Sequence, residues 1–239
     1  MRTFLAGLLL VLCPIICYPL HFIMWLKGKK DITKRWSMGK KVAGWFFNLE
    51  LKAAGVKIKV VGEENIPDTP ALFVGNHRSY LDILVHHNVI KAPVGFVAKI
   101  ELAKNILIAP YMKDIGCLFL DRNDIKQGME TIKSGTEYLK QGHSMVLFPE
   151  GARNQKETML PFKEGGYRMA EKAGVPIVPM AIIGSDRILE SAPGKGVHKG
   201  NITVVYGKPF TPSDIPLKER KAKYQELPDI IQALYDANK

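Results

Sequence analysis

From residue 56 onward the chain alternates short apolar runs with stretches of helical character, and this alternation constrains the fold more than any other feature. The runs have the length and makeup of buried strands and cover residues 56–60, 71–75, 94–98, 117–120, 145–148, 177–183 and 202–206. Helical stretches such as 124–141 and 162–173 lie between several of them, and a charged helical tail at 216–238 is broken at Pro228. The pattern predicts an α/β fold with a mixed, mostly parallel sheet covered by helices.

The first 54 residues have a different character. Residues 3–26 are apolar apart from Thr3 and His21, and as one helix they would reach about 36 Å, which is enough to cross a bilayer. Pro14 and Pro19 each remove a backbone donor, so a bent helix that stays in one leaflet fits equally well. We therefore predict a helical membrane-anchoring segment at residues 1–54 and an α/β domain at residues 55–239.

The chain is strongly basic, with a formal net charge of +11. Such a charge favours nucleic acid, an anionic membrane or a phosphorylated substrate, and the apolar start favours anionic membrane lipids and no nucleic acid. Basic residues at 27–35 follow the apolar run, so the positive-inside rule predicts a cell inner or cytoplasmic membrane with the catalytic domain on its cytoplasmic face. The amphipathic stretch 36–54 either lies in the membrane interface or packs its apolar stripe on the domain.

Polar residues follow the strand at 71–75, and His77 and Asp82 stand out among them. Residues five apart do not share a helix face, but Ser79 and Asp82 fit a capping pattern that starts a helix at Ser79. Asp82 would then fold back toward His77, hold one ring nitrogen and leave the other to accept a proton. The alternative is that Asp82 only caps a helix and His77 is an ordinary turn residue.

Two further strand ends carry charged residues. Arg122 follows the strand at 117–120 and could bind a phosphate, although an Asp–Arg pair at a strand end is usually a surface contact. Glu150, Gly151 and Arg153 follow the strand at 145–148, where the glycine would let a ligand approach the backbone. Because ligands of α/β sheets bind beyond the carboxyl ends of the strands, these groups can converge on one crevice.

These motifs together resemble the glycerolipid acyltransferase family, in particular the bacterial 1-acyl-glycerol-3-phosphate acyltransferases. The matching blocks are residues 76–82, 116–122, 148–154 and 175–180, and the resemblance covers roughly residues 56–210 in the order usual for the family. Ala152 and Asn154 stand where threonine and serine are usual in the family. These departures leave the expected roles of Glu150 and Arg153 intact.

The resemblance implies transfer of a fatty acyl group from acyl-carrier protein or acyl-CoA to the sn-2 hydroxyl of lysophosphatidate, giving phosphatidate. His77 would be the general base and Asp82 would orient it, while Arg122 and Arg153 would hold the phosphate and Glu150 and Gly151 would complete the pocket. The scheme uses no cofactor and no metal, and Cys13, Cys17 and Cys117 show no metal-ligand spacing.

Three alternatives remain on the sequence alone. The acceptor could be another lysolipid or glycerol-3-phosphate. A serine esterase would need a nucleophile elbow, but the nearest match, around Ser144, lacks the second glycine and precedes a strand. A non-catalytic protein that only binds anionic lipid would not need the four ordered motifs.

Overall fold

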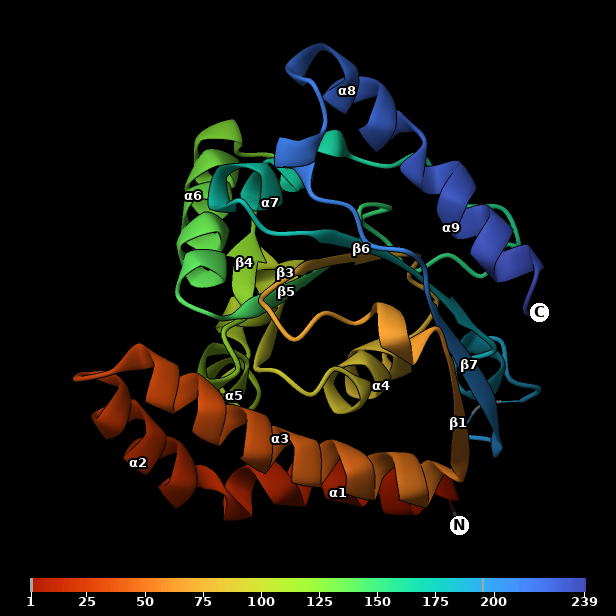
Figure 1. The fold of residues 1–239 in the computed structure, drawn as a ribbon. Coiled ribbons are helices and arrows are strands. Elements are labelled where there is room, and N and C mark those ends of the chain that lie inside the picture. Colours follow the sequence, from red (N-terminus) through yellow and green to blue (C-terminus); the bar gives the residue numbers. More distant parts are fainter. Residues whose placement is uncertain (1, 195) are drawn as a thin grey trace.

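A single mixed sheet forms the centre of the computed structural model, which describes residues 2–194 and 196–239 (Figure 1). Its seven strands lie in the order β1-β7-β6-β2-β5-β3-β4. Their bounds are β1 Val56–Val61, β2 Leu72–Gly75, β3 Val94–Lys99, β4 Leu118–Leu120, β5 Ser144–Leu147, β6 Ile177–Ile183 and β7 Gly200–Tyr206. β6 and β7 run antiparallel, and the other neighbouring pairs are parallel. The predicted mixed, mostly parallel sheet is confirmed.

Helices cover both faces of this sheet, with α3, α4 and α5 on one side and α6, α7 and α9 on the other (Figure 1). Their bounds are α1 Arg2–Ile16, α2 Tyr18–Gly28, α3 Ile32–Ala54, α4 Leu81–Val89, α5 Ala109–Asp114, α6 Ile125–Lys140, α7 Arg168–Ala173, α8 Leu217–Gln225 and α9 Leu227–Asp236. The helix predicted at 124–141 matches α6. The predicted tail breaks at Glu226, because Pro228 fits the first turn of α9, where its missing N–H costs nothing.

Two separate apolar cores hold the layers together. The strands contribute to both cores, because successive side chains along a strand point to opposite faces of the sheet. In β2, Phe73 belongs to the core on the α4 side, whereas Leu72 and Val74 belong to the core on the α6 and α9 side. All three side chains are at most 1% exposed. Successive side chains of a strand point to opposite faces, so a strand buried on both faces reads as a continuous apolar run. This explains why the strands could be located in the sequence.

The N-terminal apolar run is two helices, not one. α1 and α2 meet at Cys17 with a bend of 50°. Pro19 lies in the first turn of α2 and has no N–H to continue the hydrogen bonding of α1 across the break. Among residues 2–194 and 196–239, no individual helix has both the length and the apolar character to cross a bilayer, and α1 and α2 reach that threshold only together. The predicted anchor is therefore not confirmed as a span.

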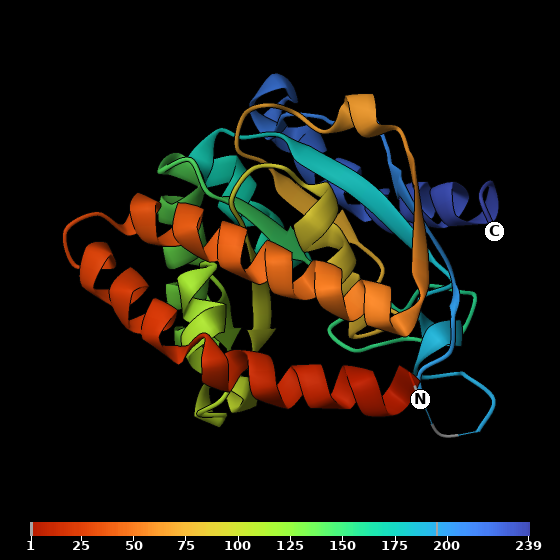
Figure 2. The same ribbon diagram turned by 90° about the horizontal axis from the view of Figure 1, so that it is seen from below.

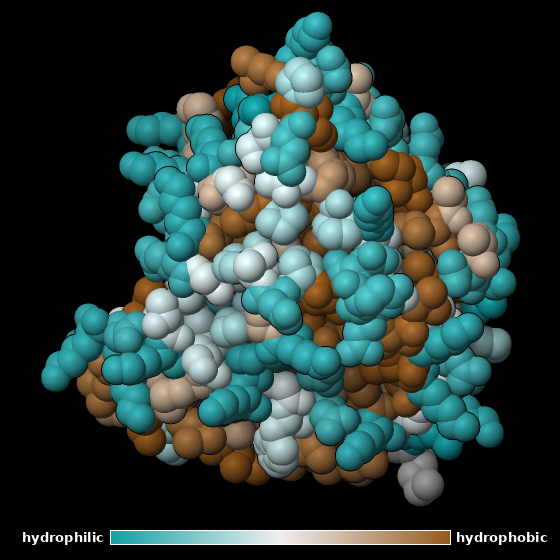
Figure 3. All heavy atoms as spheres, in the orientation of Figure 1, coloured by the Kyte–Doolittle hydropathy of each residue, from teal (hydrophilic) through white to brown (hydrophobic). Residues whose placement is uncertain are grey.

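Both helices nevertheless expose apolar side chains, including Phe4 (74%) and Ile16 (70%). In Figure 3, apolar surface is visible along the lower edge of the molecule, where Figure 1 places α1 and α2. Figure 2 shows α1, α2 and α3 lying along one side of the α/β layers. Exposed apolar side chains on neighbouring helices form a surface of the kind that contacts lipid or another protein.

A buried ion-pair cluster fastens this side to the domain. His21 of α2 contacts Asp114 of α5 at 2.7 Å, and Arg35 of α3 donates to the other oxygen of Asp114 at 2.7 Å. In α3, Trp36 is 1% exposed and stacks on His143 at 4.3 Å, whereas Trp45 is 56% exposed. One part of the apolar stripe of α3 thus packs on the α/β domain, and another part is exposed on the surface. The boundary between residues 54 and 55 stays a prediction.

Candidate active site

The carboxyl ends of five strands lie at one edge of the sheet, because β6, β2, β5, β3 and β4 are parallel neighbours. The residues at or just beyond these ends are His77 after β2, Glu150 after β5, Arg122 after β4, Asp186 after β6 and Lys99 in β3. The predicted convergence of polar strand ends therefore occurs. It is the edge at which α/β proteins bind their ligands.

His77 and Asp82 form a hydrogen-bonded dyad at this edge, with 2.8 Å between His77 Nδ1 and Asp82 Oδ2. The same oxygen accepts hydrogen bonds from the backbone N–H groups of Arg78 (2.6 Å) and Ser79 (2.9 Å). Ser79 Oγ in turn accepts from the N–H of Leu81, and the helix begins at Leu81 rather than at Ser79. Asp82 thus holds the turn that leads into the helix and also binds His77, as the predicted fold-back of its carboxylate requires.

The electrostatics keep Asp82 ionised. Burial of its carboxylate, which is completely shielded from solvent, raises the pKa, but the hydrogen bond and charge of His77 and the N–H of Ser79 outweigh it. The net pKa of Asp82 is lowered. His77 lies flat on the ring of Phe148, with 4.3 Å between ring centroids and 9° between planes, and its side chain is 18% exposed. Its Nδ1 is occupied by Asp82, so Nε2 is the nitrogen left to meet a substrate.

Glu150 turns inward and holds the loops of the site together. Its Oε1 accepts from the backbone N–H of His77 at 2.9 Å, and its Oε2 accepts from Asn154 Nδ2 and from the N–H of Leu160, both at 2.9 Å. The residue is 6% exposed. We predicted that Glu150 would complete the substrate pocket, but with both oxygens occupied the structure favours a role in positioning the His77 backbone.

Asn154, which departs from the family pattern, takes part in the same network. Its backbone N–H donates to the carbonyl of His77 at 2.7 Å, and its side-chain amide donates to Glu150 and to the carbonyl of Thr158. Serine is usual in the family at this position, and asparagine here replaces its hydroxyl. The structure shows an amide that is buried and fully engaged within the protein.

Arg122 and Gly151 lie against each other. Gly151 has a φ of 74°, in the left-handed region that favours glycine, and a Cβ at this position would be in ordinary contact with Arg122 Cζ at 3.4 Å. Arg122 is exposed at the mouth of the site. Arg153 is less open: it donates to Glu190 Oε1 at 2.9 Å and stacks on the ring of Tyr80.

Sequence reasoning missed a buried ion pair behind the dyad. Arg78 donates to both carboxylate oxygens of Asp186 at 2.8 and 2.9 Å, and to the backbone carbonyls of Gln155 and Lys156. Asp186 follows β6, so the signal that identified Arg122, a charged residue after a buried strand, applied here as well. The same signal identifies Lys99, an exposed cation at the end of β3 opposite Leu120.

A mainly apolar cavity of about 280 Å³ adjoins the dyad. It lies between the sheet and α6, and its lining includes Arg122, Phe148 and Gly151 at the site and Leu120, Ile132 and Met169 deeper inside. Phe148 therefore contacts both His77 and the cavity. Apolar pockets with a few polar groups are typical of sites that bind small molecules.

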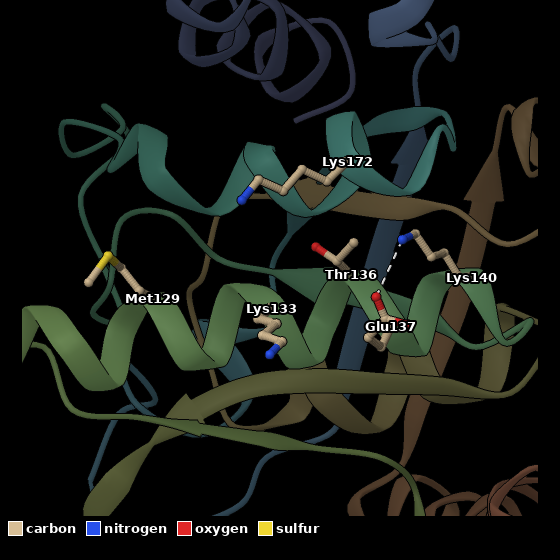
Figure 4. Close-up of a pocket in the computed structure, with 6 residues that line it drawn as sticks. All are labelled: Met129, Lys133, Thr136, Glu137, Lys140 and Lys172. Carbon is tan, nitrogen blue, oxygen red and sulfur yellow. Dashed lines mark hydrogen bonds and ion pairs between the residues drawn. The ribbon is translucent and has the colours of Figure 1, made fainter.

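A second hollow, of about 510 Å³, lies between α6 and α7 and is basic. Figure 4 shows Lys133 and Lys140 on α6 and Lys172 on α7, with Lys140 paired to Glu137. None of the predicted site residues lines this hollow. Its size does not make it the active site, since the groups capable of proton transfer lie at the edge of the sheet.

Two further histidines, His86 and His87, lie in α4 with Asp82 and are buried. Burial lowers the pKa of His86 to about 4 and that of His87 to about 3, so both rings are neutral. His86 contacts the hydroxyl of Tyr206 at 3.2 Å beneath the site. Within the described part of the chain, no three side chains of His, Cys, Asp or Glu are grouped as a metal site would require.

The family model described as Acyltransferase matches residues 57–183, which include every strand end of the site. The chain belongs to the acyltransferase family. The resemblance inferred from the four motifs is confirmed, and the dyad with its supporting loop is the part of the fold that carries the first and third motifs.

Named relatives of this acyltransferase are 1-acyl-sn-glycerol-3-phosphate acyltransferases. A probable one from Mycoplasma genitalium is 33% identical over 77% of this chain and 73% of its own length. A chloroplastic one from Arabidopsis thaliana is 33% identical over 73% of this chain, which spans only 50% of that protein. The crystal structure of the 1-acyl-sn-glycerophosphate acyltransferase PlsC from Thermotoga maritima has a TM-score of 0.73 at 25% identity and covers 99% of this chain and 97% of its own.

Proposed function

We propose that this protein transfers a fatty acyl group from acyl-carrier protein or acyl-CoA to the free sn-2 hydroxyl of 1-acyl-glycerol-3-phosphate and so forms phosphatidate. The observation that carries the proposal is the His77–Asp82 dyad, 2.8 Å across, at the ligand-binding edge of the sheet. The names of the relatives support lysophosphatidate as the acceptor. Another lysolipid or glycerol-3-phosphate is the alternative acceptor.

The dyad can perform this reaction without a covalent acyl-enzyme. Asp82 holds the proton of His77 Nδ1, and Nε2 takes the proton of the acceptor hydroxyl as its oxygen attacks the thioester carbonyl. The C–S bond then breaks, and the imidazolium returns the proton to the departing thiolate. The ionised Asp82 stabilises the imidazolium that forms between the two steps.

The phosphate and the acyl chain would both lie next to the dyad, with Arg122 at the point where they meet. Arg122 and Arg153 would bind the phosphate, and Lys99 adds a third cation at the same edge. The cavity behind Phe148 is the place where an acyl chain would be shielded from water. Gly151 would let the backbone approach the substrate at the junction of the two.

A membrane surface is the natural place for such a site. The exposed apolar side chains of α1 and α2 would insert among the lipids, and the basic residues at 27–35 would contact anionic headgroups on the cytoplasmic face. An enzyme held at headgroup level need not extract its acceptor from the bilayer, which costs about 0.8 kcal/mol per CH₂. The bend at Cys17 is compatible with two arrangements of α1 and α2: they could insert into one leaflet, or they could span the bilayer together.

The proposal is tested by acyl-transfer kinetics with lysophosphatidate and with lysophosphatidylcholine, whose phosphate is masked by choline. The wild-type enzyme should prefer lysophosphatidate, and Arg122→Ala and Arg153→Ala should each raise the KM for it by about tenfold or more, because a lost hydrogen bond between charged groups costs about 1.5–3 kcal/mol. Lys133→Ala, in the hollow beside α6, is the control for loss of one positive charge. Unchanged KM in both arginine variants would remove the phosphate assignment.

A further inference from the structure

Three segments that are distant in the sequence meet around Arg153. Its guanidinium carbon lies 3.7 Å from the centroid of the Tyr80 ring, and its Nη1 donates to Glu190 Oε1 at 2.9 Å. The backbone N–H of Tyr80 donates to the same carboxylate oxygen at 3.0 Å. Tyr80 precedes α4, Arg153 follows β5 and Glu190 follows β6, so the contact set forms only in the folded sheet.

The two contacts hold different atoms of the guanidinium. The ring of Tyr80 lies against the guanidinium carbon, and Glu190 holds Nη1. A free arginine side chain would lose about 2 kcal/mol of rotamer entropy on binding an anion, and an arginine already held in place loses less. Glu190 takes one of the five N–H donors of Arg153, which leaves donors for a ligand.

The cluster is tied directly to the catalytic dyad. Tyr80 lies two residues before Asp82 in the turn that begins at His77, and the residue after Arg153, Asn154, donates its backbone N–H to the carbonyl of His77 at 2.7 Å. Tyr80 is 56% exposed although it is aromatic, and one face of its ring is used by Arg153. The guanidinium is therefore linked to His77 through Asn154 and through the turn at residues 77–80.

We propose that Tyr80 and Glu190 are positioning residues that hold Arg153 in the orientation that receives the phosphomonoester of the acceptor. This inference rests on the proposed function, in which Arg153 binds that phosphate. Because the Glu190 carboxylate balances the charge of Arg153 in the free enzyme, a ligand must supply a well-placed anion to gain from the site. A phosphomonoester has oxygens free to match the fork, whereas a phosphodiester headgroup has one of them blocked.

The test is a KM and kcat comparison of four variants with lysophosphatidate. Tyr80→Leu removes the ring, and Glu190→Gln keeps an acceptor oxygen but loses the charge that strengthens its hydrogen bond to Arg153. Each should raise the KM by about five- to tenfold, with kcat within about twofold of the wild type, since a contact made equally in the ground and transition states acts on KM. Tyr80→Phe keeps the ring that contacts Arg153 and should have the same KM as the wild type. Glu171→Gln is the matched control, because it breaks a 2.8 Å ion pair with Arg220 outside the site.

The selectivity ratio for lysophosphatidate over lysophosphatidylcholine gives a second readout that a loss of stability would not move. It should fall in Tyr80→Leu and Glu190→Gln and stay unchanged in Tyr80→Phe and Glu171→Gln. An unchanged or lowered KM in Glu190→Gln, with Arg153→Ala still raising it, would overturn the positioning role alone. An unchanged KM in Arg153→Ala would instead overturn the phosphate assignment. If Tyr80→Leu does not fold, Glu190→Gln decides the matter.

Discussion

Replacement of Asp82 by asparagine is expected to lower kcat for acyl transfer by about 10²–10⁴-fold, the range in which general acid–base catalysis contributes. Asparagine has the shape of aspartate but no charge, so the imidazolium of His77 would form without its buried counter-ion. The neutral amide oxygen is also a weaker acceptor for His77 Nδ1–H than the carboxylate is, so the tautomer with an unprotonated Nε2 is held less firmly. The measurement is kcat at saturating lysophosphatidate and acyl donor.

Asp82→Asn has a built-in structural control. Its remaining oxygen can still accept from the N–H groups of Arg78 and Ser79, so the start of α4 should survive. Thermal unfolding of the variant should confirm a folded protein. A folded Asp82→Asn enzyme with kcat within tenfold of the wild type would contradict the assigned role of Asp82.

Replacement of Arg78 by alanine is expected to cost about 3–5 kcal/mol of folding free energy, because removal of one partner leaves a buried charge unpaired. Asp186 is 3% exposed and both of its oxygens accept from Arg78. Two backbone carbonyls, of Gln155 and Lys156, would also lose their donor. The measurement is the shift of the denaturation midpoint in urea.

The double variant Arg78→Met/Asp186→Leu separates loss of charge pairing from loss of packing. It should recover part of the lost stability, since two apolar side chains of similar size leave no buried charge. A decrease of less than about 1 kcal/mol in the folding free energy of Arg78→Ala is the range of surface ion pairs. It would contradict the description of Arg78 and Asp186 as a buried pair.

Much of the fold could be predicted because the strands are buried on both faces. Residues such as Leu72, Phe73 and Val74 give uninterrupted apolar runs, and the seven predicted strands match β1–β7 to within two residues at each end. The N-terminal run was predicted less well. Pro14 and Pro19 indicated that the run could bend, but they did not place the break at Cys17. Trp36 is held by His143, a contact more than one hundred residues away that no local pattern reveals.

The residues of the candidate site could be predicted better than the hydrogen bonds between them. His77, Asp82, Arg122 and Arg153 follow strands that the sequence shows plainly, and one capping pattern sufficed to bring Asp82 back to His77. The role of Glu150 could not be predicted, because its partners depend on how the loop from Glu150 to Leu160 folds over His77. Glu190 was missed for the same reason, since an acidic residue in a turn has no signature until its arginine is in place.

His77 is proposed as the general base of an acyl transfer to lysophosphatidate, and this role decides the mechanism. It is tested most directly by measuring phosphatidate formation by the wild-type protein and by His77→Ala in lipid vesicles, with an acyl thioester as donor. We expect steady product from the wild type and a rate at least about 10²-fold lower from folded His77→Ala. Equal rates from the two proteins, or no phosphatidate from the wild type with either acyl-carrier protein or coenzyme A thioesters, would contradict it.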